Sequence, residues 1–452
     1  MRTPICDFVT DYIDGNPLRL HMPGHKGAGE TERRDITEIG GADVLYPARG
    51  IIRESEENAA ALFGSGRTIY SAEGASLCIR AMLFLCRLYA AEQGRPPVIL
   101  AGRNAHRTFW TAAALLDMQV ETLRGESLFT CRPSAEEIAL KLDEMKEKPA
   151  AVYLTSPDYL GFRCDIAAIA RVCHARDIPL MVDNAHGAYL RFVPGALHPL
   201  EAGADLVCDS AHKTLPVLTG GAYLHVNEKA PGLFYRQGER AMEMFASTSP
   251  NWLILQSLDR CNALLAGGLR EQLAAMARET EALKTRLAEA GYVIAGAEAQ
   301  REYADPLKIT LFPKAYGYTG EALHDELRKS GMEAEFSDPD CLVMMVSPAT
   351  GMAGLLRLEQ ALRGIPRRAA VLEEPPVIPA TERVISLRQA MLGLTEEVPA
   401  AASLGRILAD ACVSCPPAVP VLTGGERVNE EVLRCFQYYK IERVSCMKET
   451  KP

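Results

Sequence analysis

Residues 149–187 decide the fold, because they contain three consecutive pieces that differ in the spacing of their apolar residues. PAAVYLTSP at 149–157 and IPLMVDNAHG at 178–187 are short and almost continuously apolar, which is typical of buried strands. DIAAIARVCHARD at 165–177 lies between them and has its apolar residues at helical spacing. A strand, a helix and a strand in this order predict a βαβ unit.

The same alternation extends on both sides of this unit. Further strands are predicted at 67–71, 96–102, 203–208 and 220–226, and helices at 77–94 and 106–118. The pattern predicts an α/β fold with a mostly parallel sheet covered by helices on both faces.

The rest of the chain has a different organisation. A long helix is predicted at 250–291, with a possible break at Gly267-Gly268, and a β–α–β–β–α pattern follows at 292–365. A proline-rich linker at about 365–382 leads to a last segment with a helix predicted at 403–412. We therefore expect an N-terminal segment (1–65), a large domain that includes the long helix (66–290) and a smaller α+β C-terminal domain (291–452).

Composition excludes several classes of protein. The chain has 452 residues, of which 48% are hydrophobic and 24% charged, as in a globular protein of more than one domain. No apolar run approaches the ~20 residues that cross a bilayer, and no secretion signal is evident. The 13 scattered cysteines suggest a reducing cytoplasm, and the net charge of −9 argues against nucleic acid and favours small ligands, including cationic ones.

Two short motifs are typical of metal sites but lack the required context. Cys412 and Cys415 form a single CxxC with no second pair nearby, so two buried thiols in a loop explain it better than zinc. His21 and His25 have the spacing of a helical zinc motif, but Pro23 and Gly24 between them break the helix. We expect no metal site.

Polar residues follow the ends of successive predicted strands. In an open α/β sheet, ligands bind beyond the carboxyl ends of the strands. The segments at these ends are Gly74-Ala75-Ser76, Arg103–His106, Thr155–Pro157, Asp183–Gly187 and Ser210–Lys213. Each has a structural explanation when taken alone, as a helix cap or a surface charge, but their shared edge favours one site.

This combination matches the requirements of pyridoxal phosphate. Its aldehyde needs a lysine amine for a Schiff base, which Lys213 offers, and its pyridine nitrogen needs a carboxylate, which Asp183 offers. The turn at 74–76 opens a helix, where backbone N–H groups suit a phosphate. His106 could stack on the ring.

Several sequence blocks around these residues resemble the Orn/Lys/Arg decarboxylase family, bacterial fold-type-I enzymes that use pyridoxal phosphate. DNAHG at 183–187 and DSAHKTLPVLTGG at 209–221 resemble the cofactor site of that family. The remaining blocks, in family order, are LRLHMPGHKGA at 18–28, the stretch 35–65, LTSPDYLG at 154–161, TSPNWLILQSLD at 248–259 and CPPAVPVLTGGE at 415–426. The likeness covers nearly the whole chain, and the length is that of the family's shorter forms.

The resemblance implies a role for each matching residue. Lys213 is expected to form the Schiff base, Asp183 to pair with the pyridine nitrogen, and His106 to stack on the ring. Among the other contacts, Gly74, Ala75, Ser76 and Ser210 are expected at the phosphate, His212 at the phosphate and reacting centre, Ala185 beneath the ring and His186 near the ring hydroxyl. Ser249, in the segment 248–250, is expected to reach the site of a neighbouring subunit in a homodimer or higher oligomer.

Three positions depart from the family pattern. The phosphate cup has Ala75 where a threonine is usual, Asn184 replaces the glutamate of Asp-Glu-Ala-His, and Tyr46 replaces a histidine. Because Lys213 and Asp183 are retained, we expect the chemistry to survive. The distal carboxylate for a basic substrate is left open among Asp35, Glu38 and Asp43.

The resemblance implies decarboxylation of arginine, lysine or ornithine to the amine and CO₂, a reaction of polyamine biosynthesis. The alternatives are another pyridoxal-phosphate reaction on the same scaffold, as in an aminotransferase or a β-eliminating lyase, and a non-catalytic regulatory paralogue. We expect neither nucleic acid nor a membrane as a partner.

Overall fold

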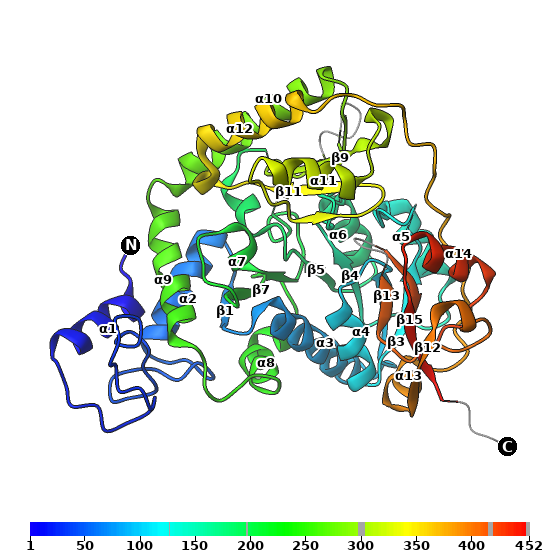
Figure 1. Ribbon diagram of the computed structural model, residues 1–452. Coiled ribbons are helices and arrows are strands. Elements are labelled where there is room, and N and C mark those ends of the chain that lie inside the picture. The colour runs from blue at the N-terminus through cyan, green and yellow to red at the C-terminus, as the bar shows by residue number, and fades with distance from the viewer. Residues whose placement is uncertain (126, 196–197, 297–302, 415–418, 449–452) are drawn as a thin grey trace. The chain divides into compact units, whose positions relative to one another are not determined.

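The structure is a computed structural model that describes residues 1–125, 127–195, 198–296, 303–414 and 419–448 (Figure 1). The chain divides into two compact units. The first comprises Met1–Arg95, Ala150–Val152 and Ile166–Leu273, and the second comprises Pro96–Pro149, Tyr153–Asp165 and Ala274–Pro452. The predicted domain boundaries at 65 and 290 stay a prediction.

A seven-stranded sheet with the order β1-β7-β6-β5-β4-β2-β3 forms the framework of the fold. Its strands are β1 (Arg67–Ser71), β2 (Val98–Gly102), β3 (Gln119–Leu123), β4 (Ala151–Thr155), β5 (Leu180–Asp183), β6 (Leu206–Asp209) and β7 (Ala222–Val226). The predicted α/β fold with a mostly parallel sheet is confirmed. β3 was not predicted, because its sequence QVETL is mostly polar and its residues other than Leu123 are not buried.

The strand register within the first unit brings two strand ends together. β5 and β6 are parallel, with Asp183 opposite Cys208, so both strands end at the same edge of the sheet. β7 runs antiparallel to both β6 and β1. These four strands are almost entirely buried, as the mostly apolar sequences of β5, β6 and β7 require.

Helices account for about half of the first unit outside its strands. They are α1 (Pro4–Asp14), α2 (Ile51–Phe63), α3 (Gly74–Glu92), α6 (Ile166–His174), α7 (Ala211–Thr214), α8 (Gly232–Glu243) and α9 (Trp252–Ala266), with a 3-10 turn η1 (Ala188–Phe192). Helix α3 packs against α8, and α2 packs against α9 and β1 (Figure 1). α9 begins where the Asn251 side chain accepts hydrogen bonds from the backbone N–H groups of Leu253 and Ile254.

Helix α3 meets a length-and-composition criterion for a membrane-spanning helix, although charged residues interrupt its apolar sequence. Its most apolar window has a mean hydropathy of 1.4, which is high enough for a membrane-spanning helix. Arg80 and Arg87 interrupt the apolar residues in this window but do not bring its mean hydropathy below that level. In this structure 61% of its most apolar window is buried, as in the core helix of a globular protein. Length and composition are therefore weak grounds for placing it in a membrane.

The predicted break in the long helix is confirmed. α9 ends at Ala266, with Gly267 as its C-cap residue, and α10 (Leu269–Glu289) begins after Gly268. The segment that follows contains β8 (Val293–Ile294), β9 (Lys308–Phe312), α11 (Gly320–Lys329), β10 (Phe336–Ser337), β11 (Leu342–Met345) and α12 (Gly351–Gly364), with 3-10 turns η3 (Pro313–Tyr316) and η4 (Pro348–Thr350). Its four strands form a sheet in the order β10-β11-β9-β8.

The C-terminal segment differs from its prediction. No helix forms at 403–412, because the backbone there makes bridges instead: Leu408 N–H donates to the carbonyl oxygen of Glu426, and Gly405 adopts a φ of +79°. Two-stranded sheets join β12 (Thr395–Pro399) with β15 (Arg443–Met447) and β13 (Cys412–Ser414) with β14 (Pro420–Thr423). The other elements of the second unit are α4 (Arg107–Leu115), α5 (Ala135–Glu144), α13 (Leu387–Leu392), η5 (Ala400–Ala402) and α14 (Glu430–Tyr438).

A buried ion pair anchors the late GGE block within the second unit. The Arg103 guanidinium meets both carboxylate oxygens of Glu426, at 3.0 and 2.9 Å, and also donates to the backbone carbonyls of Pro420 and Val421. Both side chains are about 5% exposed. Each charge has lost its hydration, and the opposite charge of the other side chain is needed to offset that loss. Cys415, the second cysteine of the CxxC, lies outside the described residues.

Candidate active site

Lys213 lies in a short turn immediately after β6. The turn is the single-turn helix α7, which the backbone closes by a hydrogen bond from Lys213 N–H to the Ser210 carbonyl, 3.0 Å. The lysine side chain is exposed, while Ser210 before it is buried. Its Nζ lies 3.2 Å from Nε2 of His186. Two residues predicted from separate strand ends are thus in hydrogen-bonding contact.

Asp183 is the last residue of β5 and is 2% exposed. Its Oδ1 accepts a hydrogen bond from the Ala185 backbone N–H at 3.1 Å and from the Cys208 thiol at 3.5 Å. Burial, with the negative charge of Asp183 next, raises the pKa of the Cys208 thiol well above its usual value, so the thiol stays protonated and can donate. The predicted ring-contact residue Ala185 is also buried.

The predicted phosphate cup opens helix α3. Gly74 has a φ of +71°, a conformation that favours glycine, and the N-cap residue Glu73 makes no side-chain cap bond to the helix. Ala75 is buried and Ser76 half-buried. The start of a 19-residue helix presents backbone N–H groups and the positive end of its dipole, which suit a phosphate even where the threonine hydroxyl is replaced by Ala75.

The diglycine Gly220-Gly221 joins the cup to the lysine turn. The Gly220 carbonyl accepts a 2.6 Å hydrogen bond from Gly74 N–H, and the Gly221 carbonyl accepts from His212 N–H at 3.2 Å. His212 Nδ1 also lies 3.1 Å from the Gly221 carbonyl oxygen. A Cβ on Gly74 would lie 4.0 Å from the His212 ring, so the cup and this histidine are neighbours.

Ser249 and His106 occupy different surroundings. Ser249 is exposed, and its loop is tied to the residue before the cup by a 2.7 Å hydrogen bond from Ser247 N–H to the Glu73 carboxylate. His106 belongs to the second unit, where it is the N-cap of α4 and its Nδ1 accepts from the Thr108 backbone N–H at 3.2 Å. The expected ring contact of His106 and the expected reach of Ser249 into a neighbouring subunit both stay predictions.

Two N-terminal positions have structural roles that the sequence did not reveal. The Asp43 carboxylate accepts hydrogen bonds from the backbone N–H groups of Val44, Arg49, Gly50, Ile52 and Arg53, around the start of α2. This side chain therefore caps the helix, which leaves Asp35 and Glu38 as candidates for the distal carboxylate. Tyr46, the replacement for a family histidine, donates its hydroxyl to the Tyr70 carbonyl at the end of β1.

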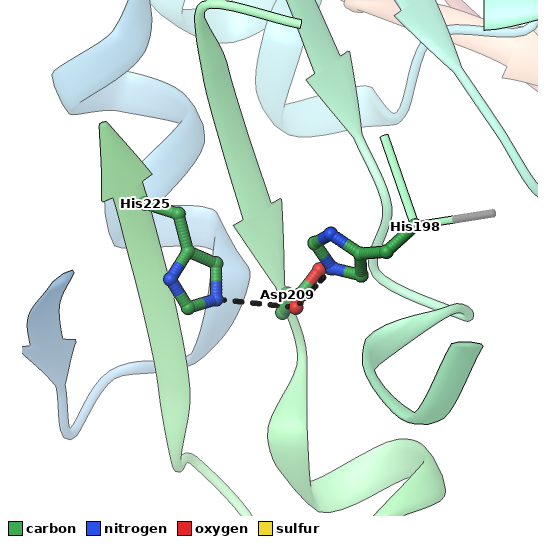
Figure 2. A group of neighbouring side chains, drawn as sticks. All are labelled: His198, Asp209 and His225. Atoms are coloured by element: carbon green, nitrogen blue, oxygen red, sulfur yellow. Dashed lines mark hydrogen bonds and ion pairs between the residues drawn. The ribbon is translucent and has the colours of Figure 1, made fainter. Parts of the chain in front are cut away.

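Sequence-based reasoning missed a buried cluster directly behind the lysine turn. Asp209, the residue before Ser210, accepts hydrogen bonds from His198 Nε2 at 2.9 Å and His225 Nε2 at 3.2 Å (Figure 2). All three side chains are fully buried. Burial alone would raise the pKa of the Asp209 carboxyl, but the two imidazoles hold it below its usual value. The one available signal was a histidine inside the apolar strand AYLHV.

The residues of the first unit fit pyridoxal phosphate. A helix start without a side-chain cap, an exposed lysine amine and a buried carboxylate supply the three kinds of group that its phosphate, aldehyde and pyridine nitrogen need. The seven-stranded sheet delivers Lys213 and Asp183 at adjacent strand ends. Fold and site together define a fold-type-I enzyme that depends on this cofactor.

Comparison with known proteins agrees with this class. Residues 3–291 match the family model of the Orn/Lys/Arg decarboxylase major domain. An arginine decarboxylase of Halalkalibacterium halodurans is 30% identical over 96% of this chain and 92% of its own length, and one of Bacillus subtilis is 28% identical over 95% and 92%. The solved structure of the constitutive lysine decarboxylase of E. coli superposes with a TM-score of 0.78 at 17% identity, over 99% of this chain and 82% of that one.

The chain belongs to the Orn/Lys/Arg decarboxylase family. It is a carboxy-lyase that decarboxylates a basic amino acid with pyridoxal phosphate, as the sequence blocks predicted. The roles of the individual site residues stay predictions.

Proposed function

We propose that this enzyme decarboxylates arginine in preference to lysine and ornithine, with Lys213 and Asp183 as its central catalytic residues. The observation that carries the proposal is the placement of the exposed Lys213 amine and the buried Asp183 carboxylate at adjacent parallel strand ends. The preference for arginine rests on relatives that cover nearly the whole chain and are named arginine decarboxylases.

When bound, pyridoxal phosphate supplies an aldehyde that captures the substrate amine and a ring that accepts the electron pair left by departing CO₂. Asp183 keeps a proton on the ring nitrogen, since a buried carboxylate strongly favours a nearby cation. Lys213 holds the cofactor before the substrate arrives and accepts the proton of the incoming amine. His212 or Lys213 delivers a proton to the substrate Cα.

The other predicted residues hold and orient the cofactor. Gly74, Ala75, Ser76 and Ser210 would bind its phosphate, and the hydrogen bonds through Gly220 and Gly221 keep that cup in register with His212. His186 would reach the ring hydroxyl from its place 3.2 Å from Lys213 Nζ. Ala185 would pack beneath the ring, and His106 would stack on the opposite face.

The direct test is CO₂ release from arginine, lysine, ornithine and an acidic amino acid as a negative control. We expect the highest kcat/KM with arginine. Lys213→Ala is expected to abolish turnover and the visible absorbance that borohydride removes from the wild type. Lys229→Ala, at an exposed lysine elsewhere in the unit, serves as the matched control and keeps both.

The two alternatives predict different products. An aminotransferase would form a keto acid without releasing CO₂, and a regulatory paralogue would bind the cofactor without turning over any basic amino acid. Either result would overturn the proposal. A preference for lysine or ornithine would overturn only the choice of arginine.

We also propose that the enzyme is a cytoplasmic homodimer that contributes to polyamine synthesis and binds neither nucleic acid nor a membrane. Twelve described cysteines are free thiols, and eleven of them are buried, which suits a reducing compartment. The amine made by decarboxylating arginine belongs to the class of compounds from which polyamines are built.

A further inference from the structure

Asp209 connects the lysine turn to the body of the fold. It ends β6, it is fully buried, and the turn Ser210–Thr214 that carries Lys213 follows at once. A buried carboxylate is costly unless every oxygen accepts hydrogen bonds. The partners of its two oxygens therefore decide what this residue does.

Two imidazoles satisfy Oδ2. His198 Nδ1 accepts a hydrogen bond from the Leu200 backbone N–H, so this nitrogen has no proton and His198 Nε2 carries the proton that it donates to Asp209. Burial lowers the pKa of His225 below its usual value, so this imidazole is neutral. It donates from Nε2 to Asp209 and accepts at Nδ1 from the Thr68 hydroxyl, 2.8 Å away. Figure 2 shows both rings directed at the same carboxylate.

The other oxygen, Oδ1, accepts a 2.6 Å hydrogen bond from Nδ2 of Asn184. Asn184 is fully buried and follows Asp183 directly. Its backbone N–H donates to the Cys208 carbonyl at 2.9 Å, so both its backbone and its side chain are fixed to the end of β6. Asn184 Oδ1 has no hydrogen-bond partner among the described residues. The amide is thus oriented by Asp209 alone.

The same three side chains, His198, Asp209 and His225, could in principle hold a metal ion, since their ligand atoms lie within 4.8 Å of one another. The hydrogen-bond directions argue against this reading. Both Nε2 atoms carry protons that point at Asp209, and the second carboxylate oxygen is taken by Asn184. A metal would need unprotonated nitrogens and would break all these bonds.

We propose that Asp209 is a positioning residue for the decarboxylation, holding Asp183 and Lys213 in one frame through its hydrogen bond to Asn184. The proposal rests on the proposed roles of Asp183 and Lys213. His198 and His225 fix the carboxylate, and the carboxylate fixes Asn184. Asp183 comes one residue before Asn184, and Lys213 comes four residues after Asp209, so the hydrogen bond joins the two segments that carry the catalytic groups.

Asn184, at the centre of this link, is one of the positions where the sequence departs from the family pattern, which has a glutamate there. An amide at 184 can donate where a carboxylate cannot. Asn184 and Asp209 therefore act as a donor–acceptor pair.

A double-mutant cycle tests the pair. Asn184→Asp places two buried carboxylates face to face, and we expect the Kd of the folded apoenzyme for pyridoxal phosphate to rise and kcat at saturating cofactor to fall, each by about tenfold or more. Asp209→Asn alone is milder, because Asn184 can turn its amide to pair with the new one. The double variant restores donor and acceptor in exchanged positions, so both quantities should return to within about threefold of wild type.

Asp205→Asn is the matched control. Asp205 immediately precedes β6, whereas Asp209 is the last residue of that strand. Like Asp209, Asp205 is buried and its carboxylate forms a hydrogen bond with a histidine, His174 Nε2, at 2.9 Å. We expect this variant to change the melting temperature at most, with Kd for the cofactor and kcat at their wild-type values.

Two results would overturn the proposal. One is an Asn184→Asp variant with normal Kd and kcat; if that variant melts at a lower temperature, the network serves folding alone. The other is a double variant whose Kd and kcat are no better than those of Asn184→Asp. The cofactor Kd needs no turnover, so it tests the network even if the wild type decarboxylates none of the basic amino acids.

Discussion

The Asp183 side chain, at the end of β5, is held in one orientation by neighbouring groups. Its carboxylate is buried and receives hydrogen bonds from the Ala185 N–H and the Cys208 thiol, both on Oδ1. These bonds fix the orientation of the carboxylate before any cofactor arrives. Preorganised groups of this kind make a large contribution to catalysis, because they need not reorganise during the reaction.

We expect Asp183→Asn to lower kcat by about 10²-fold or more, because an amide cannot stabilise a proton on the ring nitrogen. The measurement is steady-state CO₂ release with saturating cofactor. Asp177→Asn, at an exposed turn residue, is the control and should retain full activity. Wild-type kcat in Asp183→Asn would remove this residue from the mechanism.

Glu56 on α2 makes a prediction about stability and pH. Burial raises its pKa from 4.5 to about 8, and its Oε1 accepts from the Tyr70 backbone N–H. The pKa of Glu56 in the folded protein lies above its pKa in the unfolded chain. The contribution of the protonated Glu56 carboxyl to the free energy of unfolding is therefore complete below about pH 4.5 and is lost as the pH rises to about 8.

Glu56→Gln removes this ionisation while keeping the acceptor for Tyr70. Relative to wild type, we expect the variant to gain roughly 3 kcal/mol of stability between pH 5 and pH 8. Melting temperatures of both proteins across this range measure the gain. Glu57→Gln, at the exposed neighbour, should give a difference that hardly changes with pH. A constant difference for Glu56→Gln would mean that its carboxyl is already ionised in the folded protein.

The sequence predicted Lys213, Asp183 and the turn at 74–76 as site residues because they follow recognisable strands, and their roles stay predictions. It did not predict the buried side chains next to them. His198 was missed because it comes from a turn with no regular pattern, and Asp209 because one strand-end aspartate resembles any other. Their contact depends on tertiary packing between β6, β7 and the segment before β6, which spacing along the chain does not encode.

At the scale of elements, the buried strands were the most predictable part of the fold. Five of the seven strands of the main sheet, all except β1 and β3, have near-continuous apolar sequences, which leave little ambiguity once helices alternate with them. β3 is mostly polar and gave no such signal. The helix predicted at 403–412 failed because its backbone pairs with residues 426–428 and 445–446, partners that local propensity cannot anticipate.

The turn between the lysine and β7 supplies an element-scale prediction. Gly220 has a φ of +102°, and a Cβ there would lie 2.9 Å from Ile254 Cδ1 and 3.0 Å from the Ala72 carbonyl oxygen. Its own carbonyl holds Gly74 of the phosphate cup. An alanine would therefore displace the backbone on which the cup depends.

We expect Gly220→Ala to cost about 1–3 kcal/mol of stability and to weaken cofactor binding. Thermal melting of the apoenzyme and titration with pyridoxal phosphate give the two quantities. Gly268→Ala is the control, because Gly268 has an ordinary φ and a Cβ there would meet no atom within 4 Å. Unchanged cofactor affinity in Gly220→Ala would mean that the Gly220–Gly74 bond does not support the cup.

At the scale of the whole molecule, the N-terminal PGHK block has an unusual distribution of polarity. Leu18, Leu20 and Met22 are 84%, 84% and 68% exposed, whereas Arg19 between them is 9% exposed. The Arg19 guanidinium donates to the backbone carbonyls of residues 32, 33 and 35, which fixes this alternation. Clustered apolar side chains on a surface mark a site of association.

This pattern predicts that Leu18 and Leu20 lie in the interface of the proposed homodimer. We expect the wild type to be dimeric by light scattering after gel filtration, and the Leu18→Glu/Leu20→Glu variant to be shifted toward monomer, because charges in an apolar interface lose their hydration without gaining partners. Leu372→Glu, at a leucine of the linker that is 85% exposed, is the control and should stay dimeric.

Because the resemblance implies that residues 248–250 complete a neighbouring site, the monomer should also lose activity in proportion to its fraction. A monomeric wild type with full activity would contradict both the interface and the shared site, and a double variant that stays dimeric would contradict the interface alone.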